Sequence, residues 1–161
     1  MFYSYVDSPI GPLLLSGTQD YLSGLYFSTG SKARGPDPQW QHSDTVFLPV
    51  KQQLDEYFAG ERKAFDITLA PQGTPFQQSV LAALQDIPFG ETRSYGEVAV
   101  AIGNPKSVRA VGSANGNNPI ALIIPCHRVI GSNGSLTGFG GGLETKRFLL
   151  EFEMQHSGLW A

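Results

Sequence analysis

The stretch SYGEVAVAIGNPKSVRAVGSANG, residues 94–116, contains two short helical patterns in succession. In the first, Ser94 and Glu97 have the spacing of a capping box, and Gly103 supplies the end. The second, residues 104–116, begins with an Asn-Pro pair that suits an N-cap and first helical position, and a glycine ends it. Two short helices joined by a tight turn predict a helix-turn-helix, with a plain helical hairpin as the alternative.

The face of the second helix indicates how it could meet a partner. At about 100° per residue, one side carries only small or basic residues, namely Lys106, Arg109, Gly112, Ser113 and Gly116. The opposite side carries Val108, Val111 and Ala114, which can pack inward. A helix that reads base sequence normally presents Asn, Gln or Arg side chains to base edges. This smooth, basic face instead predicts close approach to DNA without sequence recognition.

The rest of the C-terminal half is also mainly helical. Thr74 can cap a helix over residues 75–87, in which four apolar residues share one stripe: Phe76, Val80, Leu84 and Ile87. A last helix begins at Leu143 and carries Glu153 near its end. We therefore expect a mainly α domain with a helix-turn-helix over residues 71–161.

The N-terminal part shows strand patterns with one helix. Its predicted elements are two strands within 1–17, a strand over 22–28, a helix over 45–60 and a strand over 64–69. Its polar residues form no cluster that a reaction would need. We expect a small α/β domain, a β-sheet plus one helix, over residues 1–70.

Composition limits the broad class of protein. With 161 residues, 41% of them hydrophobic and 16% charged, the chain can bury a globular core as one domain or two small ones. No apolar run approaches the ~18 residues of a membrane span, and the first residues lack the pattern of a signal peptide. We expect an intracellular, cytoplasmic protein with no membrane partner.

The net charge of −3 is unevenly distributed along the chain. Residues 1–70 carry five Lys or Arg against eight Asp or Glu, whereas residues 71–161 carry six of each. Residues 92–130 carry four Lys or Arg and one Glu, a local excess of three positive charges. This patch predicts weak, salt-sensitive contact with a nucleic-acid backbone.

The single cysteine of the sequence lies in IIPCHRVIG, residues 123–131. A lone Cys after an apolar run is often just a small core hydrophobe. Here His127 and Arg128 follow Cys126, and such groups lower the pKa of a thiol and make it nucleophilic. The apolar run 120–124 can be a buried, strand-like segment that carries Cys126 to the edge of a pocket. On an extended segment neighbouring side chains point to opposite sides, so contact between Cys126 and His127 requires a local turn.

Several longer stretches resemble one protein family. RAVGSANGNNPIALIIPCHRVIG (109–131), followed by TGFGGG (137–142) and KRFLLEFE (146–153), closely resembles the O6-alkylguanine-DNA alkyltransferases, also called methylated-DNA–protein-cysteine methyltransferases. GTPFQQSVLAALQDIPFGETRSYGEVA resembles the same family, so the resemblance covers most of residues 73–153. The N-terminal half resembles the variable first domain of the family, mainly at SPIGPL (8–13).

The resemblance implies a suicide DNA repair protein that moves an alkyl group from guanine O6 irreversibly to its own Cys126. Alkylated thymine O4 is a further candidate substrate. His127 would accept the thiol proton, directly or through a water, and Glu153 would orient and stabilise His127. Asn118 would brace this network. Tyr95 would donate a proton or hydrogen bond to guanine as its O6–carbon bond breaks.

The resemblance also implies how DNA would be held. Arg109 would enter the duplex and fill the gap left by a flipped-out nucleotide, with a phosphate contact as its alternative role. Further contacts to DNA would come from Lys106, Gly112 and Ser113. The base pocket would be formed by the chain at Cys126, Val129, Phe139 and Gly140. Arg128 would be structural, in a buried ion pair that ties the two halves together, with contact to DNA as its alternative role.

Two departures from the family pattern affect these expectations. Phe139 stands where the family most often carries Tyr, so a hydroxyl hydrogen bond is lost while stacking on the base is kept. Some members hold a structural zinc in the first domain through Cys and His, but residues 1–70 contain only His42 and no Cys. We therefore expect no metal and no cofactor, and a monomer that binds double-stranded DNA carrying O6-alkylguanine without sequence specificity.

Three alternative functions stay open. A non-catalytic sensor of alkylated DNA would lack the nucleophile, which Cys126 argues against. A cysteine hydrolase would use Cys126, His127 and Glu153 on an acyl substrate. A helix-turn-helix regulator would need a sequence-reading helix face and a dimer helix, and the sequence suggests neither.

Overall fold

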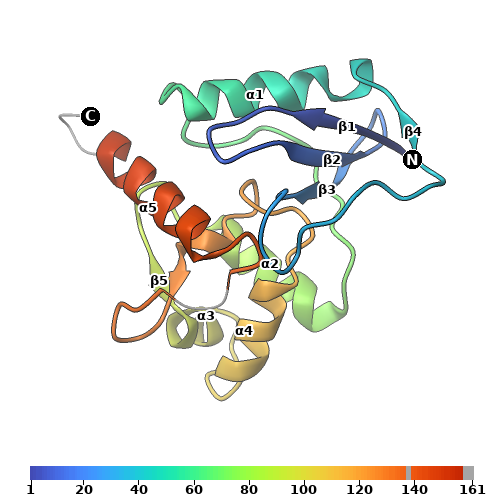
Figure 1. Ribbon diagram of the computed structural model, residues 1–161. Coiled ribbons are helices and arrows are strands. Elements are labelled where there is room, and N and C mark those ends of the chain that lie inside the picture. The colour runs from blue at the N-terminus through green and yellow to red at the C-terminus, as the bar shows by residue number, and fades with distance from the viewer. Residues whose placement is uncertain (137–138, 158–161) are drawn as a thin grey trace.

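A computed structural model describes residues 1–136 and 139–157 of the chain. A small β-sheet with one long helix comes first and a group of helices follows, which confirms the predicted fold class. Figure 1 shows α1 lying along one face of the sheet at one end of the molecule, with α3 and α4 together at the opposite end. Within the described residues, no helix combines the length and the apolar character needed to cross a membrane.

The N-terminal sheet has the strand order β3-β2-β1-β4. Its strands are β1 (Phe2–Val6), β2 (Leu13–Gly17), β3 (Leu22–Tyr26) and the short β4 (Gln41–His42). Strands β1, β2 and β3 are antiparallel neighbours, and β4 adds to β1 in parallel. Gly11 enters the left-handed region with a φ of 95° in the turn between β1 and β2, where a glycine is favoured. Every residue of β2 is buried, because this inner strand is covered on both faces.

A short 3-10 helix, η1 (Thr45–Phe47), leads into α1 (Leu48–Phe58). The expected side-chain cap from Asp44 or Thr45 is absent from this helix start. The carboxylate of Asp44 instead pairs with Lys51 at 3.0 Å and accepts from the hydroxyl of Ser4, so it fastens α1 to β1.

The prediction of a strand over residues 64–69 was wrong. This segment contributes a single bridge, between Leu69 and Leu22. The side chain of Gln53 in α1 donates to the Asp66 carbonyl at 3.0 Å and accepts from the Asp66 amide at 2.9 Å. Because these backbone groups bond to a side chain, they are not available for a strand ladder.

The C-terminal part contains α2 (Pro75–Gln85), α3 (Tyr95–Ala101), α4 (Val108–Gly116) and α5 (Leu143–Ser157). The predicted caps at Thr74 and Ser94 are confirmed, since each residue forms a complete capping box, with Gln77 and Glu97 respectively. The predicted cap at Asn104 was wrong, because Ser107 is the N-cap of α4. Short strands β5 (Arg93–Ser94) and β6 (Val129–Ile130) pair in parallel and connect α3 to the segment after Cys126.

Helix α4 begins later than expected. The carbonyl of Asn104 accepts from the Ser107 amide at 3.0 Å and from the Ser107 hydroxyl at 2.7 Å, so residues 104–107 form a turn. Val108 consequently opens the helix at the surface with 41% exposure, and the expectation that it packs inward was wrong. Val111 and Ala114 are buried, as predicted.

Buried side chains of both halves form one continuous core. At its centre, the backbone of Leu25 in β3 donates to the carbonyl of Pro119 at 2.9 Å and accepts from the amide of Ala121 at 3.2 Å. The segment that leads to Cys126 therefore lies against the N-terminal sheet.

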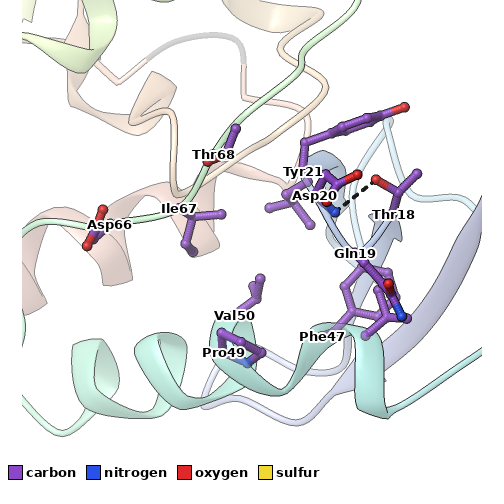
Figure 2. Close-up of a pocket in the computed structure, with 12 residues that line it drawn as sticks. Thr18, Gln19, Asp20, Tyr21, Phe47, Pro49, Val50, Asp66, Ile67 and Thr68 are labelled. Carbon is purple, nitrogen blue, oxygen red and sulfur yellow. Dashed lines mark hydrogen bonds between the residues drawn. The ribbon is translucent and has the colours of Figure 1, made fainter.

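A cavity of about 190 Å³ lies in the N-terminal part, between the β2–β3 turn, the start of α1 and residues 66–68. Figure 2 shows Val50 and Ile67 pointing toward one another across it. Its lining includes neither Cys126 nor His127 nor Glu153, so the candidate chemistry lies elsewhere.

Candidate active site

A tight, buried turn places Cys126. Residues 120–124 are buried as expected but do not form a strand-like segment. The amide of Ile123 donates to the carbonyl of Ala121 at 2.8 Å, and Leu122 takes a left-handed φ of 71°. A β-carbon-bearing residue in this region costs ~1–3 kcal/mol, and such strain is concentrated at functional sites. The chain then enters a 3-10 helix, η2 (Cys126–Arg128), which supplies the local turn between Cys126 and His127.

Two asparagines hold this turn. The amide of Asn118 donates to the Ile124 carbonyl at 2.8 Å, and its side-chain oxygen accepts from the Ile120 amide at 3.0 Å. Asn115, in the last turn of α4, donates to the Cys126 carbonyl at 3.3 Å. Sequence reasoning missed Asn115, although its place four residues after the buried Val111 could have indicated a position facing inward.

The thiol of Cys126 is only 4% exposed. Burial raises its pKa, while the neighbouring Asn118 side chain, the positive charge of Lys146 and the Leu122 backbone lower it in part. Lys146, which sequence reasoning also missed, is fully buried in α5 and donates to the Val129 carbonyl at 2.6 Å. Burial lowers the pKa of Lys146 to about 8. A thiol in this setting needs a base to become a thiolate.

His127 and Glu153 form a buried pair. Nε2 of His127 lies 2.8 Å from Oε2 of Glu153, and both side chains are almost completely shielded from solvent. Because a carboxylate can only accept, Nε2 carries the hydrogen and Nδ1 is left as an acceptor. Nδ1 has no hydrogen-bond partner in the described part of the chain, Cys126 included. Burial lowers the pKa of His127 although Glu153 raises it, which favours a neutral ring that can accept a proton.

Arg128 neutralises the other side of Glu153. Its Nε donates to Oε1 at 2.7 Å and its Nη2 to Oε2 at 3.0 Å, while Nη1 donates to the Ile87 carbonyl at 2.7 Å. Burial raises the pKa of Glu153, but hydrogen bonds and charges from His127 and Arg128 outweigh it and hold the pKa well below its usual range. The expected buried ion pair of Arg128 is present, but both of these partners lie in the C-terminal half, so the expectation that it ties the two halves together was wrong. The contact to Glu153 that crosses between the halves comes from Tyr57 in α1, whose hydroxyl donates to Oε2 at 2.6 Å.

A small pocket of about 30 Å³ adjoins Cys126. Its walls come from β3, the loop after β3, the end of α4, the segment after α4 and the glycine loop before α5: Leu25, Tyr26, Phe27, Lys32, Asn115, Gly116, Asn118, Ala121, Phe139, Gly140 and Gly141. Phe139 packs on Phe27 with ring centroids 5.3 Å apart. Residues 137–138 of the TGFGGG motif lie outside the described residues.

The N-terminal half closes this pocket. The amide of Lys32 donates to the Gly140 carbonyl at 3.0 Å, and the hydroxyl of Thr29 donates to the Gly141 carbonyl at 3.3 Å. At Gly30, whose φ is 89°, an added β-carbon would come within 2.2 Å of the same Gly140 oxygen. Residues 1–70, in which the sequence indicated no chemistry, thus form part of the site wall.

The helix-turn-helix presents its expected face to solvent. Lys106, Arg109 and Ser113 are exposed, and Gly112 is half-buried. Tyr95, the first residue of α3, is half-buried, and a β-carbon on Gly112 would lie 3.9 Å from its ring. Exposed Val100 and Val108 add an apolar component to the surface of α3 and α4. Val129 is buried at the start of β6.

Among the predicted residues, the structure brings His127, Glu153 and Arg128 together in one buried hydrogen-bonded network. The half-buried Asn118 braces the turn that carries the buried Cys126. Phe139 and Gly140 line the pocket beside Cys126, whereas Lys106 and Arg109 lie on the exposed face of the helix-turn-helix. A thiol, a neutral imidazole and an ionised carboxylate in this order can generate a buried nucleophile.

Comparisons of the sequence with known proteins all identify the same family. Residues 1–71 match the model of the 6-O-methylguanine DNA methyltransferase ribonuclease-like domain, and residues 75–155 match the DNA binding domain of the same family. The methylated-DNA–protein-cysteine methyltransferase of Methanosarcina acetivorans is 54% identical over 153 residues, which is 95% of this chain and 98% of that relative.

Solved structures agree with these matches. The crystal structure of Mycobacterium tuberculosis OGT in complex with DNA has a TM-score of 0.92 and 49% identity, with 99% of this chain and 96% of that chain covered. An O6-methylguanine DNA methyltransferase from Methanococcus jannaschii has a TM-score of 0.66 and 28% identity, with 94% and 93% covered.

Proposed function

The chain belongs to the 6-O-methylguanine DNA methyltransferase family, and we propose that it repairs O6-alkylguanine in double-stranded DNA by irreversible transfer of the alkyl group to its own Cys126. O4-alkylthymine is a second candidate substrate. We assign DNA binding and transfer to a domain at residues 71–161 and the pocket wall to a domain at residues 1–70. The observation that carries the proposal is the buried Cys126, which is followed in η2 by His127 with its ring paired to Glu153.

Transfer would begin with activation of the thiol. The proton of Cys126 would pass to Nδ1 of His127 through a water, because the protein atoms described offer Nδ1 no direct partner. The new imidazolium would be stabilised by the carboxylate of Glu153, 2.8 Å from Nε2. Asn118, whose side chain lowers the pKa of Cys126, would help to stabilise the thiolate. This assignment is supported by the low pKa of Glu153. Burial raises that pKa, but His127 and Arg128 lower it by more.

The thiolate would then attack the alkyl carbon on guanine O6. A sulfur–carbon bond forms as the carbon–oxygen bond breaks, and the bonding electrons of the latter move to guanine. Tyr95 would stabilise the negative charge on the departing base by a hydrogen bond, or neutralise it by giving the base its proton. The product is a thioether on Cys126. Because the sequence holds no second cysteine to remove the alkyl group, each molecule would react once.

The buried thiol would reach only a base that has left the stack. We propose that Lys106, Gly112 and Ser113 contact the DNA and that Arg109 fills the gap of the flipped nucleotide. Val129, Phe139 and Gly140 would form the base pocket. The present pocket of about 30 Å³ is far smaller than the ~300 Å³ or more of typical ligand sites, so binding would require the glycine loop and residues 29–32 to separate.

The proposal is tested by counting repaired lesions. A limiting amount of protein is mixed with excess O6-methylguanine duplex, and the remaining lesions are measured after completion. We expect one lesion repaired per molecule, and none with Cys126→Ser. Many lesions per molecule would contradict irreversible transfer, and tight binding with no repair would support the non-catalytic sensor.

A further inference from the structure

One hydrogen bond to the Glu153 carboxylate comes from the N-terminal half. Tyr57 lies in α1 with its side chain fully buried, and its hydroxyl donates to Oε2 of Glu153 at 2.6 Å. The same oxygen faces Nε2 of His127 at 2.8 Å and accepts from Nη2 of Arg128 at 3.0 Å. Three donors therefore share one carboxylate oxygen, and His127 competes for it with a residue from the other half of the chain.

The hydroxyl of Tyr57 is held firmly in place. Its ring packs in an aromatic cluster with centroid distances of 5.0 to 6.0 Å to four neighbours, Phe58, Phe65, Phe89 and Phe152. Two of these neighbours come from each half of the chain, so the ring is fixed at the junction. Burial raises the pKa of Tyr57, and the negative charge of Glu153 raises it further. The phenol thus remains a protonated donor at neutral pH.

A shared acceptor changes the proton affinity of His127. A carboxylate oxygen that accepts several hydrogen bonds offers less negative charge to each donor. The charged groups that face His127 are Glu153 and Lys146 in α5 and Arg128 in η2. Burial lowers the pKa of His127, Glu153 raises it, and the two cations lower it. A donor that draws on Oε2 of Glu153 weakens the contribution that makes His127 more basic.

We propose that Tyr57 is a positioning residue of the transfer reaction, whose hydroxyl fixes Oε2 of Glu153 and thereby limits the basicity of His127. This gives the N-terminal half a part in the chemistry, although Tyr57 touches neither the thiol nor the base. The inference rests on the proposed function, in which His127 accepts the proton of Cys126.

The variant Tyr57→Phe tests the inference because it removes one oxygen and keeps the ring. The single-turnover rate constant for methyl transfer from an O6-methylguanine duplex is measured as a function of pH. Without the phenol, His127 experiences more of the negative charge of Glu153, and its pKa rises. The ring therefore stays protonated up to a higher pH, where it cannot accept the proton of Cys126. We expect the acidic limb of the profile to move upward by about half to one pH unit. An NMR titration of the His127 ring should move in the same direction.

Two further variants separate this effect from packing. Phe65→Leu disturbs the ring of Tyr57, 5.5 Å away, without touching Glu153, and should lower the melting temperature while leaving the acidic limb in place. Replacement of Tyr57 by a fluorinated tyrosine keeps the packing and strengthens the donor, and should move the acidic limb downward. If Tyr57→Phe does not fold, the fluorinated variant decides the question.

A rate that falls by the same factor at every pH, with an unmoved His127 titration, would overturn the inference and leave Tyr57 a packing residue. Intact-protein mass measurement in the same reactions distinguishes this from failure of the proposed function. If wild-type protein gains a methyl group on Cys126 but the profiles coincide, only the Tyr57 inference fails. If wild-type protein gains none, the proposed function fails and the inference with it.

Discussion

The side-chain amide of Asn115 donates a hydrogen bond to the carbonyl oxygen of Cys126 at 3.3 Å. Asn115 belongs to the last turn of α4, the helix whose outer face carries Arg109. A second link runs from Asn118, just beyond the helix, to the Ile124 carbonyl at 2.8 Å. The helix proposed to meet DNA is thus joined directly to the residue proposed to accept the alkyl group.

Alkylation of Cys126 should destabilise the folded protein. The thiol is 4% exposed and the pocket beside it measures about 30 Å³, which leaves little room for added carbon. Overfilling a packed site typically costs ~1 to 3 kcal/mol. In the absence of DNA, thermal midpoints should therefore decrease from unmodified to methylated to benzylated protein. Equal or higher midpoints for the alkylated forms would mean that the pocket yields without strain.

The bond from Asn115 should also carry this strain to the DNA-binding face. Alkylated wild-type protein should bind undamaged duplex more weakly than unmodified protein, and Asn115→Ala should reduce that difference. The variant itself should lose ~1 kcal/mol of stability with its hydrogen bond. Asn117→Ala is a matched control, since Asn117 caps the same helix and bonds to Ser113 and Lys32 instead. An alkylation effect of the same size in Asn115→Ala would exclude this route.

Arg109→Ala should affect transfer from duplex DNA and transfer from the free alkylated base to different extents. Arg109 is exposed on α4, and only the duplex requires unstacking, which costs ~a few kcal/mol. Transfer from duplex should slow far more than transfer from free O6-methylguanine. For comparison, Lys106→Ala should weaken DNA binding and reduce the slope of log binding constant against log salt concentration by about 1. Equal losses on both substrates in Arg109→Ala would argue for a role outside base flipping.

Stability should fall in two stages as pH decreases. Burial holds the pKa of His127 below its unfolded value of about 6.5, so the unfolded chain binds an extra proton below that pH and stability is lost. Although burial raises the pKa of Glu153, His127 and Arg128 hold it low, so its contribution is present above about pH 4.3 and lost below.

Urea unfolding at a series of pH values measures both stages. His127→Gln should flatten the first stage and keep the second, because Arg128 still pairs with Glu153 at 2.7 Å. An unchanged slope between about pH 6.5 and 5 in this variant would show that other groups cause the early loss.

Local signals predicted the fold well where a few neighbouring residues decide an element's end. Thr74 caps α2 as predicted, and Ser94 with Glu97 forms the capping box that their spacing indicates. Predictions failed where a side chain from a distant part of the sequence forms hydrogen bonds with the backbone. Gln53 in α1 occupies both backbone groups of Asp66, which no local pattern around residue 66 reveals.

The same distinction holds at the candidate site. The adjacency of Cys126, His127 and Arg128 could be read directly from the sequence. Tyr57 is an ordinary residue type far away in the chain, and the fold alone brings it to Glu153. Nothing in its local sequence marks it as a member of a site. Lys146 lies in the KRFLLEFE stretch, but that pattern does not reveal that its side chain donates to the Val129 carbonyl.

Intact-protein mass spectrometry after incubation with an O6-methylguanine duplex tests the central claim most directly. We predict that the whole population gains the mass of one methyl group in place of one hydrogen, that peptide mapping places it on Cys126, and that Cys126→Ser gains nothing. Repair of the duplex with no mass gain, or a methyl group on any other residue, would contradict transfer to Cys126.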